Sequence, residues 1–271
     1  MTRWALRVLA GVLGIVLGVY VAPAPVHSPA GRPVADAPAV QEPSPSPAPS
    51  PAPSPSPPPL AGLTIALDPG HQLGNHDFPA RIDRLVPAGG FRKACNTTGT
   101  ATAAGVPEAT VVWRVTRLVQ HRLQALGATV RLTRTSNRAD RWGPCVDVRG
   151  RFGGKVGAAL TVSVHADGAP AGDHGFHVIA RPHDRVSLRL AKALRAGFDG
   201  HRLARSNYIG GGTALSIRTD LATLNLSTVP TAMLEIGNMA DRADARRMTS
   251  PRGQARYAAA IVAGIRDFLR R

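Results

Sequence analysis

Cysteine is scarce in this chain of 271 residues, where only Cys95 and Cys145 occur. Their wide separation excludes a CxxC metal or redox motif. In a chain that leaves the cytoplasm, an isolated pair is typical of a single disulfide. The N-terminus, described below, indicates export. We therefore predict one disulfide that joins Cys95 to Cys145.

Acidic and aromatic residues are also few. The chain has 17 acidic residues against 33 basic ones, a formal net charge of +16, and only 4% aromatic residues. Such an excess of positive charge favours polyanionic surroundings such as nucleic acid, anionic lipid or acidic wall polymers. The basic residues are spread along the chain, however, without a concentrated patch or interleaved aromatic residues. We expect a solvated basic surface and no nucleic-acid partner.

The N-terminus has the pattern of an export signal. Arg3 and Arg7 precede an apolar stretch from Val8 to Ala22, which matches a basic n-region followed by a hydrophobic h-region. A membrane helix needs about 20 apolar residues, and residues 4–22 come close to that length. Two outcomes stay open: residues 1–22 are a cleaved signal peptide, or they are an uncleaved anchor. We expect an exported protein of the cell wall or a periplasm-like space, either secreted or tethered to the membrane.

Residues 23–60 are dominated by Pro, Ala and Ser. This composition cannot bury a core and favours an extended, disordered linker. We interpret it as a spacer that holds a catalytic domain away from a membrane or within a wall, the alternative being a dispensable tail. Residues 61–271 are long enough for one domain with a full core.

Within 61–271, short apolar runs alternate with amphipathic segments, which predicts an α/β fold. We expect a single domain with a mostly parallel central sheet flanked by helices. The polar, Gly-rich stretch 72–107 is predicted to be a long loop, tied down by Cys95. Strands are predicted at 63–67, 129–133, 160–164, 175–179 and 231–234, and helices at 108–126, 146–156, 185–198 and 252–269.

Three of the apolar runs end in ionisable residues, namely His71, His165 and Glu235, and Glu108 opens the long amphipathic segment. The carboxyl ends of strands gather the functional groups of an open α/β sheet. Two histidines and one glutamate suit a zinc hydrolase, which uses three protein ligands and keeps one position for water. A further carboxylate then moves the proton of that water to the leaving amine. His71, Glu108 and His165 are the candidate ligands, and Glu235 is the candidate base.

Each of these residues also has an ordinary structural explanation. A lone histidine at a strand end is often only hydrogen-bonded, and Glu108 suits the dipole at a helix N-terminus. Glu235 has fewer such explanations, because buried carboxylates are rare unless paired. The sequence has no HExxH motif. His174 and His177 are competing ligands, but at strand spacing they would face opposite sides.

The order of the segments resembles that of the zinc-dependent N-acetylmuramoyl-L-alanine amidases of the amidase-3 type. Similarity is greatest to exported actinobacterial members, which share the cysteine pair and a segment like Ser206-Asn207-Tyr208-Ile209-Gly210. The segments that carry the resemblance are Leu67-Asp68-Pro69-Gly70-His71, Glu108, Val130-Arg131-Leu132-Thr133-Arg134, Asp147-Val148-Arg149, Ser163-Val164-His165-Ala166-Asp167, Gly175-Phe176-His177-Val178, Met233-Leu234-Glu235-Ile236-Gly237-Asn238 and the C-terminal helix.

This resemblance implies one zinc ion per chain, held by His71, Glu108 and His165, with Glu235 as the catalytic residue. The implied reaction is cleavage of the amide between N-acetylmuramic acid and L-alanine of the peptidoglycan stem peptide. We expect the protein to be a monomer. Two alternatives are another zinc amidase or carboxypeptidase acting on wall peptides, and a non-catalytic wall-binding module. No added wall-binding domain is visible, so targeting is expected to come from the anchor, the linker or bulk charge.

Overall fold

The computed structural model describes Ala22, Ala24 and residues 57–270. The predicted signal or anchor and most of the predicted linker therefore lie outside the described residues. Packing begins at Leu60, whose side chain is buried in the core and whose amide donates to the carbonyl of Leu126 (2.9 Å). Among the described residues, no helix combines the length and apolar character needed to cross a membrane.

A six-stranded sheet forms the centre of the domain, in the order β4-β1-β5-β8-β6-β7. Strands β4, β1, β5 and β8 run parallel, while β6 runs antiparallel to β8 and parallel to β7. The predicted α/β fold with a mostly parallel sheet is confirmed. The parallel arrangement brings the carboxyl ends of β1, β5 and β8 to one edge of the sheet. The strands are β1 (Thr64–Pro69), β4 (Thr129–Leu132), β5 (Leu160–Asp167), β6 (His177–Ala180), β7 (Leu215–Ile217) and β8 (Thr231–Asn238).

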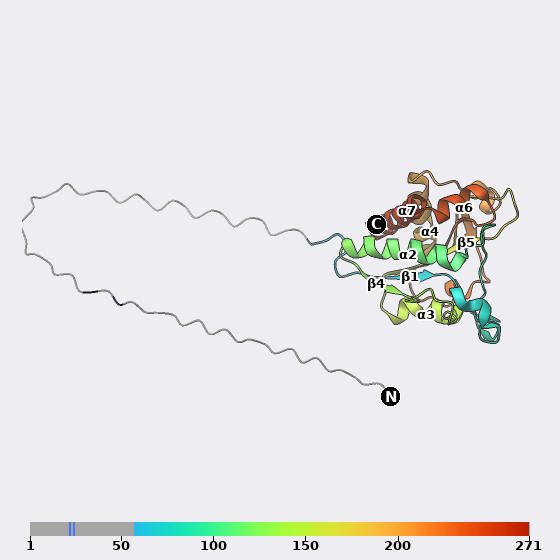
Figure 1. The fold of residues 1–271 in the computed structure, drawn as a ribbon, viewed down its shortest axis with the longest axis horizontal. Helices are drawn as coiled ribbons and strands as arrows, with labels where there is room; N and C mark the ends of the chain where they lie inside the picture. The colour runs from blue at the N-terminus through green and yellow to red at the C-terminus, as the bar shows by residue number, and fades with distance from the viewer. Residues whose placement is uncertain (1–21, 23, 25–56, 271) are drawn as a thin grey trace, which may run out of the picture. The chain divides into compact units, whose positions relative to one another are not determined.

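Helices cover the two faces of this sheet unequally (Figure 1). On one face lie α2 (Glu108–Ala125), α4 (Arg185–Gly200) and α7 (Pro251–Arg270), with α6 (Arg242–Thr249) packed against α7. On the other lie the shorter α3 (Val146–Lys155) and α5 (Ala222–Asn225). The main hydrophobic core fills the first face. The second face has only a smaller apolar cluster, formed by Ile179, Leu224 and Met233, and polar side chains occupy other positions on it.

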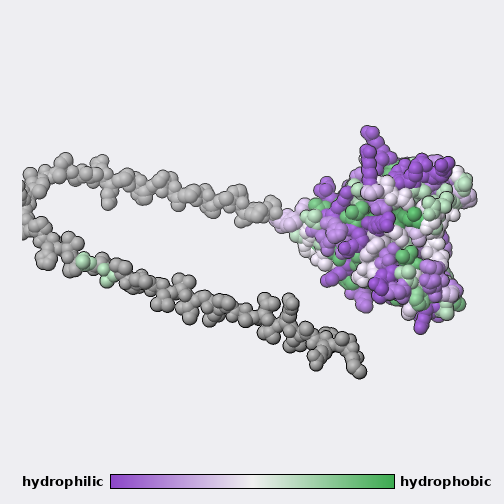
Figure 2. All heavy atoms as spheres, viewed as in Figure 1, coloured by the Kyte–Doolittle hydropathy of each residue, from purple (hydrophilic) through white to green (hydrophobic). Residues whose placement is uncertain are grey.

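Outside the core, the visible surface of the domain is mostly hydrophilic (Figure 2). Figure 2 shows hydrophilic residues over much of the visible face of the domain, interrupted by smaller apolar patches. This agrees with the expected solvated surface, because charged side chains keep their hydration there.

The stretch 72–107 differs from the predicted long loop. It contains η1 (Leu73–Asp77), α1 (Pro79–Ile82) and a hairpin of β2 (Leu85–Pro87) and β3 (Arg92–Ala94). Cys95 directly follows the hairpin and is bonded to Cys145, which confirms the predicted disulfide. The short elements β7, α5 and α6 and the 3-10 turn η2 (Gly210–Gly212) were also not predicted.

Two strands extend further than their apolar runs suggest. The pairing of β5 with β8 continues through His165 and Glu235, which lie opposite each other, and ends at Asp167 and Asn238. Backbone hydrogen bonding therefore carries both strands past the last apolar residue. As a result, His165 and Glu235 are held in the paired part of the two strands, directly before a register shift between His165 and Asp167.

Candidate metal centre

His71 lies just beyond β1, in a left-handed backbone conformation (φ 52°) that is uncommon outside glycine. Its Nδ1 is 3.0 Å from the carbonyl oxygen of Thr97, and its Nε2 is 3.2 Å from Oε1 of Glu108. Because a carbonyl only accepts hydrogen bonds, Nδ1 carries the proton. The Nε2 lone pair is then available for a metal.

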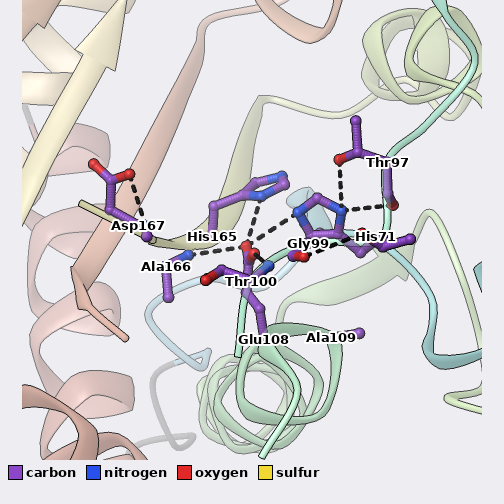
Figure 3. A network of polar contacts seen from close by, with 12 residues as sticks. His71, Thr97, Gly99, Thr100, Glu108, Ala109, His165, Ala166 and Asp167 are labelled. Carbon is purple, nitrogen blue, oxygen red and sulfur yellow. Dashed lines mark hydrogen bonds and ion pairs between the residues drawn. The ribbon is translucent and has the colours of Figure 1, made fainter. Parts of the chain in front are cut away.

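Glu108 is the first residue of α2 and is almost fully buried. Its Oε1 is 3.0 Å from Nδ1 of His165 and accepts from the amide of Ala166 (3.1 Å), while Oε2 accepts from the amide of Thr100 (3.1 Å). Figure 3 shows the carboxylate between the two imidazole rings. Burial alone would raise the pKa of Glu108, but His71 and His165 outweigh it and hold the pKa well below its usual value. The residue is therefore an anion at neutral pH.

The donor atoms of His71, Glu108 and His165 all lie within 4.8 Å of one another. The two rings meet edge to face, with centroids 4.8 Å apart. Two imidazole nitrogens and one carboxylate oxygen form a donor set that zinc accepts in catalytic sites. The arrangement thus fits a zinc ion, and the structure brings together the three residues selected from the sequence.

The competing histidines lie elsewhere. Among the described residues, no metal-ligand group includes His174 or His177. His174 is exposed, with its Nδ1 3.3 Å from the carbonyl of Gly172. His177 begins β6 and is buried, and burial lowers its pKa to about 4.

Two glycines let the backbone approach the candidate ligands closely. A Cβ on Gly70 would lie 2.4 Å from Cε1 of His165. Gly99 has φ +79°, and its Cβ would lie 2.9 Å from Oε2 of Glu108. A side chain at either position would displace a candidate ligand, and at Gly99 it would also strain the backbone.

Two buried arginines, which the sequence did not suggest as site residues, hold the turn before His71. Arg149 donates to the carbonyls of Pro69 (2.8 Å) and His71 (2.7 Å). Arg134 donates to the carbonyls of Pro69 (3.0 Å) and Gly70 (3.1 Å). Both arginines belong to segments that carry the family resemblance, which was the only signal for them. Their guanidinium groups fix the left-handed turn that aims the His71 ring.

Asp68 balances the charge of Arg149. Its fully buried carboxylate pairs with Arg149 (2.5 Å) and accepts from the hydroxyls of Thr133 and Ser163. Burial alone would raise the pKa of Asp68, but the charge of Arg149 and these hydrogen bonds lower it overall. Asp68 and Arg149 therefore form a buried ion pair beneath the candidate metal centre.

Glu235 projects from β8 between His165 on β5 and His177 on β6. It lines a cavity of about 330 Å³ together with His71, Glu108 and His165. Its Oε2 is buried, and no hydrogen-bond partner for it exists among the described residues. Burial, followed by the charges of Glu108 and Asp167, raises the pKa of Glu235 well above its usual value. The side chain is free to exchange a proton with a molecule in the cavity.

Asp167 also lines the cavity, but both of its oxygens are engaged. Oδ2 accepts from the hydroxyl of Tyr208 (2.9 Å), and Oδ1 accepts from the amide of Gly168 (2.9 Å). Tyr208 comes from the segment before η2 and lies edge to face with His177 (centroids 6.0 Å apart). These bonds make Asp167 a less available proton acceptor than Glu235.

Comparisons with known proteins agree with this geometry. Residues 65–267 match the model of the family described as N-acetylmuramoyl-L-alanine amidase. A curated N-acetylmuramoyl-L-alanine amidase of Mycobacterium tuberculosis is 38% identical over 217 residues, which are 78% of this chain and 88% of that protein.

Two solved structures are also similar. The amidase Ami1 from Mycobacterium smegmatis is 38% identical, with a TM-score of 0.74 over 78% of this chain and 98% of that one. The apo form of Ami1 from Mycobacterium abscessus is 40% identical, with a TM-score of 0.73 over 78% of this chain and 100% of that one.

Proposed function

Because the chain belongs to the N-acetylmuramoyl-L-alanine amidase family, we propose that His71, Glu108 and His165 bind one zinc ion and that Glu235 is the general base. The protein is a peptidoglycan amidase that cleaves the amide between N-acetylmuramic acid and L-alanine of the stem peptide. The observation that carries the zinc proposal is the convergence of two ring nitrogens on Oε1 of Glu108.

The three ligands are prepared for a cation by their other contacts. Thr97 holds the proton of His71 on Nδ1, and two backbone amides hold the carboxylate of Glu108. When bound, zinc supplies Lewis acidity, which polarises the scissile carbonyl and lowers the pKa of a coordinated water. The buried pair of Asp68 and Arg149 keeps the turn of His71 fixed, so the site does not have to be ordered on binding.

Glu235 moves the proton in this proposal. Its unpartnered Oε2 accepts a proton from the attacking water and delivers it to the nitrogen of the leaving L-alanine. A carboxylate whose pKa is raised by burial is a stronger base than an ordinary glutamate. Asp167 is the weaker candidate, because Tyr208 and Gly168 already occupy its oxygens.

The rest of the chain fits an exported enzyme. We propose that residues 1–22 direct export, residues 23–60 act as a spacer, and residues 61–271 form the catalytic domain of a monomer. Intact-mass measurement of protein from membrane and medium fractions distinguishes an anchor from a cleaved signal. A dominant soluble species that begins after residue 22 would exclude the anchor.

Digestion of purified peptidoglycan followed by mass spectrometry tests the function. We expect stem peptides with a free N-terminal L-alanine and glycans that keep their lactyl groups. Peptides shortened at their C-termini would instead indicate a carboxypeptidase, and binding without cleavage would indicate a wall-binding module. Elemental analysis of the same preparation should find about one zinc per chain.

A further inference from the structure

The cavity beside the candidate metal centre has a basic wall. Lys93, from β3 of the hairpin, lines the cavity and is half-buried. Its Nζ donates to the backbone carbonyl of Asp220 (3.0 Å). Within residues 57–270, no carboxylate oxygen forms an ion pair with this ammonium group. Its charge also acts on the carboxylate of Asp220, which is itself paired with Arg218. A half-buried ammonium group without a direct ion pair can bind an anion in the cavity.

Arg218 shortly precedes the cavity-lining residues Leu221, Ala222 and Thr223. It follows β7, and its amide donates to the carbonyl of Ala180 (3.0 Å) at the end of β6. Ser216 of β7 lies opposite Ile179, and His177 of β6 lies opposite Glu235. Because side chains alternate along strands, Ser216 and Arg218 share the face that carries His177 and Glu235. The charge of Arg218 accordingly acts on both Glu235 and Asp167.

The present partner of Arg218 is easily exchanged. Arg218 and Asp220 form a two-bond pair, Nε to Oδ1 (2.8 Å) and Nη2 to Oδ2 (2.5 Å). The two side chains are 44% and 53% exposed, so water screens the pair and its net contribution to stability is small. A ligand carboxylate can therefore replace Asp220 on the guanidinium group at low cost, in the bidentate geometry that arginine favours.

The cavity lining combines the carboxylates of Glu108 and Glu235 with the ammonium group of Lys93. Arg218 adds a second positive charge beside the cavity, which acts on Glu235 and Asp167. The peptide that is released when this amide is cleaved starts with L-alanine. We propose that Lys93 and Arg218 bind a carboxylate of the stem-peptide residue that follows L-alanine. The enzyme then prefers stems in which this carboxylate is free over stems in which it is amidated. This inference rests on the proposed function.

Binding of the released peptide tests the proposal without turnover. Isothermal titration of the full-length protein with L-alanyl-D-isoglutamate and L-alanyl-D-isoglutamine compares a carboxylate with its amide at one position. We expect the acid to bind about tenfold more tightly, as for one charge-assisted hydrogen bond at a partly exposed site. Lys93→Gln keeps a donor toward Asp220 but removes the charge, and should reduce the acid-to-amide preference to near unity. Lys93→Arg should retain the preference.

Arg138→Gln is the matched control for Arg218→Gln. Arg138 pairs with Asp140 through the same Arg-x-Asp spacing and with similar exposure, 59% and 52%. The charge that acts on Arg138 is that of Asp140, whereas Glu235 and Asp167 of the cavity also act on Arg218. Arg218→Gln should reduce the acid-to-amide preference, whereas Arg138→Gln should keep it.

Cleavage of the corresponding muropeptides provides the second measurement. In Lys93→Gln, the kcat/KM ratio of acid over amide substrate should fall about tenfold, through KM. An equal loss of kcat/KM on both substrates would overturn the proposal. Such a loss would mean that Lys93 or Arg218 supports the structure of the hairpin or the charge of Glu235 and does not contact the substrate carboxylate. A wild-type enzyme that cleaves both substrates equally well would overturn it too, while leaving the amidase function intact. A wild-type enzyme that cleaves neither would overturn the function itself.

Discussion

On one face of the sheet, β1, β5 and β8 present Leu67, Val164 and Leu234 to the core under α2, α4 and α7. On the other face, neighbouring residues of the same strands are Asp68, His165 and Glu235. Because strand side chains alternate, one backbone supports both sets. The apolar set contributes burial energy, while the polar set supplies charge and a candidate metal ligand, His165. Substitutions on the first face should therefore change stability, and substitutions on the second should change metal binding and catalysis.

Glu108→Ala should have the largest effect on metal binding and catalysis, although Glu108 comes from α2 and not from a strand. It removes the carboxylate that both histidines contact, so zinc occupancy and amidase activity should fall together to background. The fold should survive, because α2 still buries its apolar residues against the sheet. Elemental analysis, circular dichroism and muropeptide digestion on one preparation check this. Full zinc occupancy with normal activity would show that Glu108 is not a ligand.

Asp68→Asn and Leu234→Ala compare the two faces directly. Asp68→Asn leaves Arg149 buried without its counter-charge, which should cost about 3–5 kcal/mol in the free energy of unfolding. It should also weaken zinc binding, because Arg149 positions the backbone of His71. Leu234→Ala should cost about 2–5 kcal/mol through the cavity that it leaves, with zinc affinity unchanged.

Denaturant titration together with zinc titration measures both quantities for each variant. If Leu234→Ala lost as much zinc affinity as Asp68→Asn, the two faces would not have separate roles. The exposed pair of Arg138 and Asp140 provides the control, since Arg138→Gln should alter neither quantity.

The loss of unfolding free energy at acidic pH should depend on Asp68. Its pKa is lowered in the folded protein, so it contributes stability above its unfolded pKa of about 3.9, and that contribution is lost as pH falls through the folded pKa. The difference in unfolding free energy between wild type and Asp68→Asn should therefore be largest near neutrality and shrink below about pH 4. A difference that stays constant down to acidic pH would mean that the charge of Asp68 is not what stabilises the fold.

Tyr208→Phe should have the smallest effect. It removes one hydrogen bond to Asp167 without changing the packing of the ring, which corresponds to about 0.5–1.5 kcal/mol. Activity should drop only severalfold, with zinc retained, because Asp167 lines the cavity but is not one of the three candidate ligands. Kinetics on muropeptides measure this. A loss of turnover as large as that expected for a general base would indicate that Asp167, and not Glu235, is the base.

The sequence allowed much of the polar face to be predicted, because its ionisable residues follow apolar runs. His165 and Glu235 were selected for this reason, and Glu108 because it begins a periodic helix. The anchoring by Arg134 and Arg149 could not be predicted, since their partners are backbone carbonyls more than 60 residues away. The β2–β3 hairpin escaped prediction because its strands are three residues long and Leu85 is exposed. The positions of Lys93 and Arg218 near the cavity could not be predicted either, because the fold brings them there from distant parts of the sequence.

The Glu235→Gln variant tests the central claim most directly, because it keeps the shape of the side chain and removes only the charge that accepts a proton. Zinc content, fold and muropeptide turnover should be measured on one preparation, beside the wild type. We predict full zinc occupancy, an unchanged fold and a turnover about 10²–10⁴-fold lower, the usual contribution of a positioned acid–base group. Normal zinc content with near wild-type turnover would contradict the assignment of Glu235 and direct attention to Asp167.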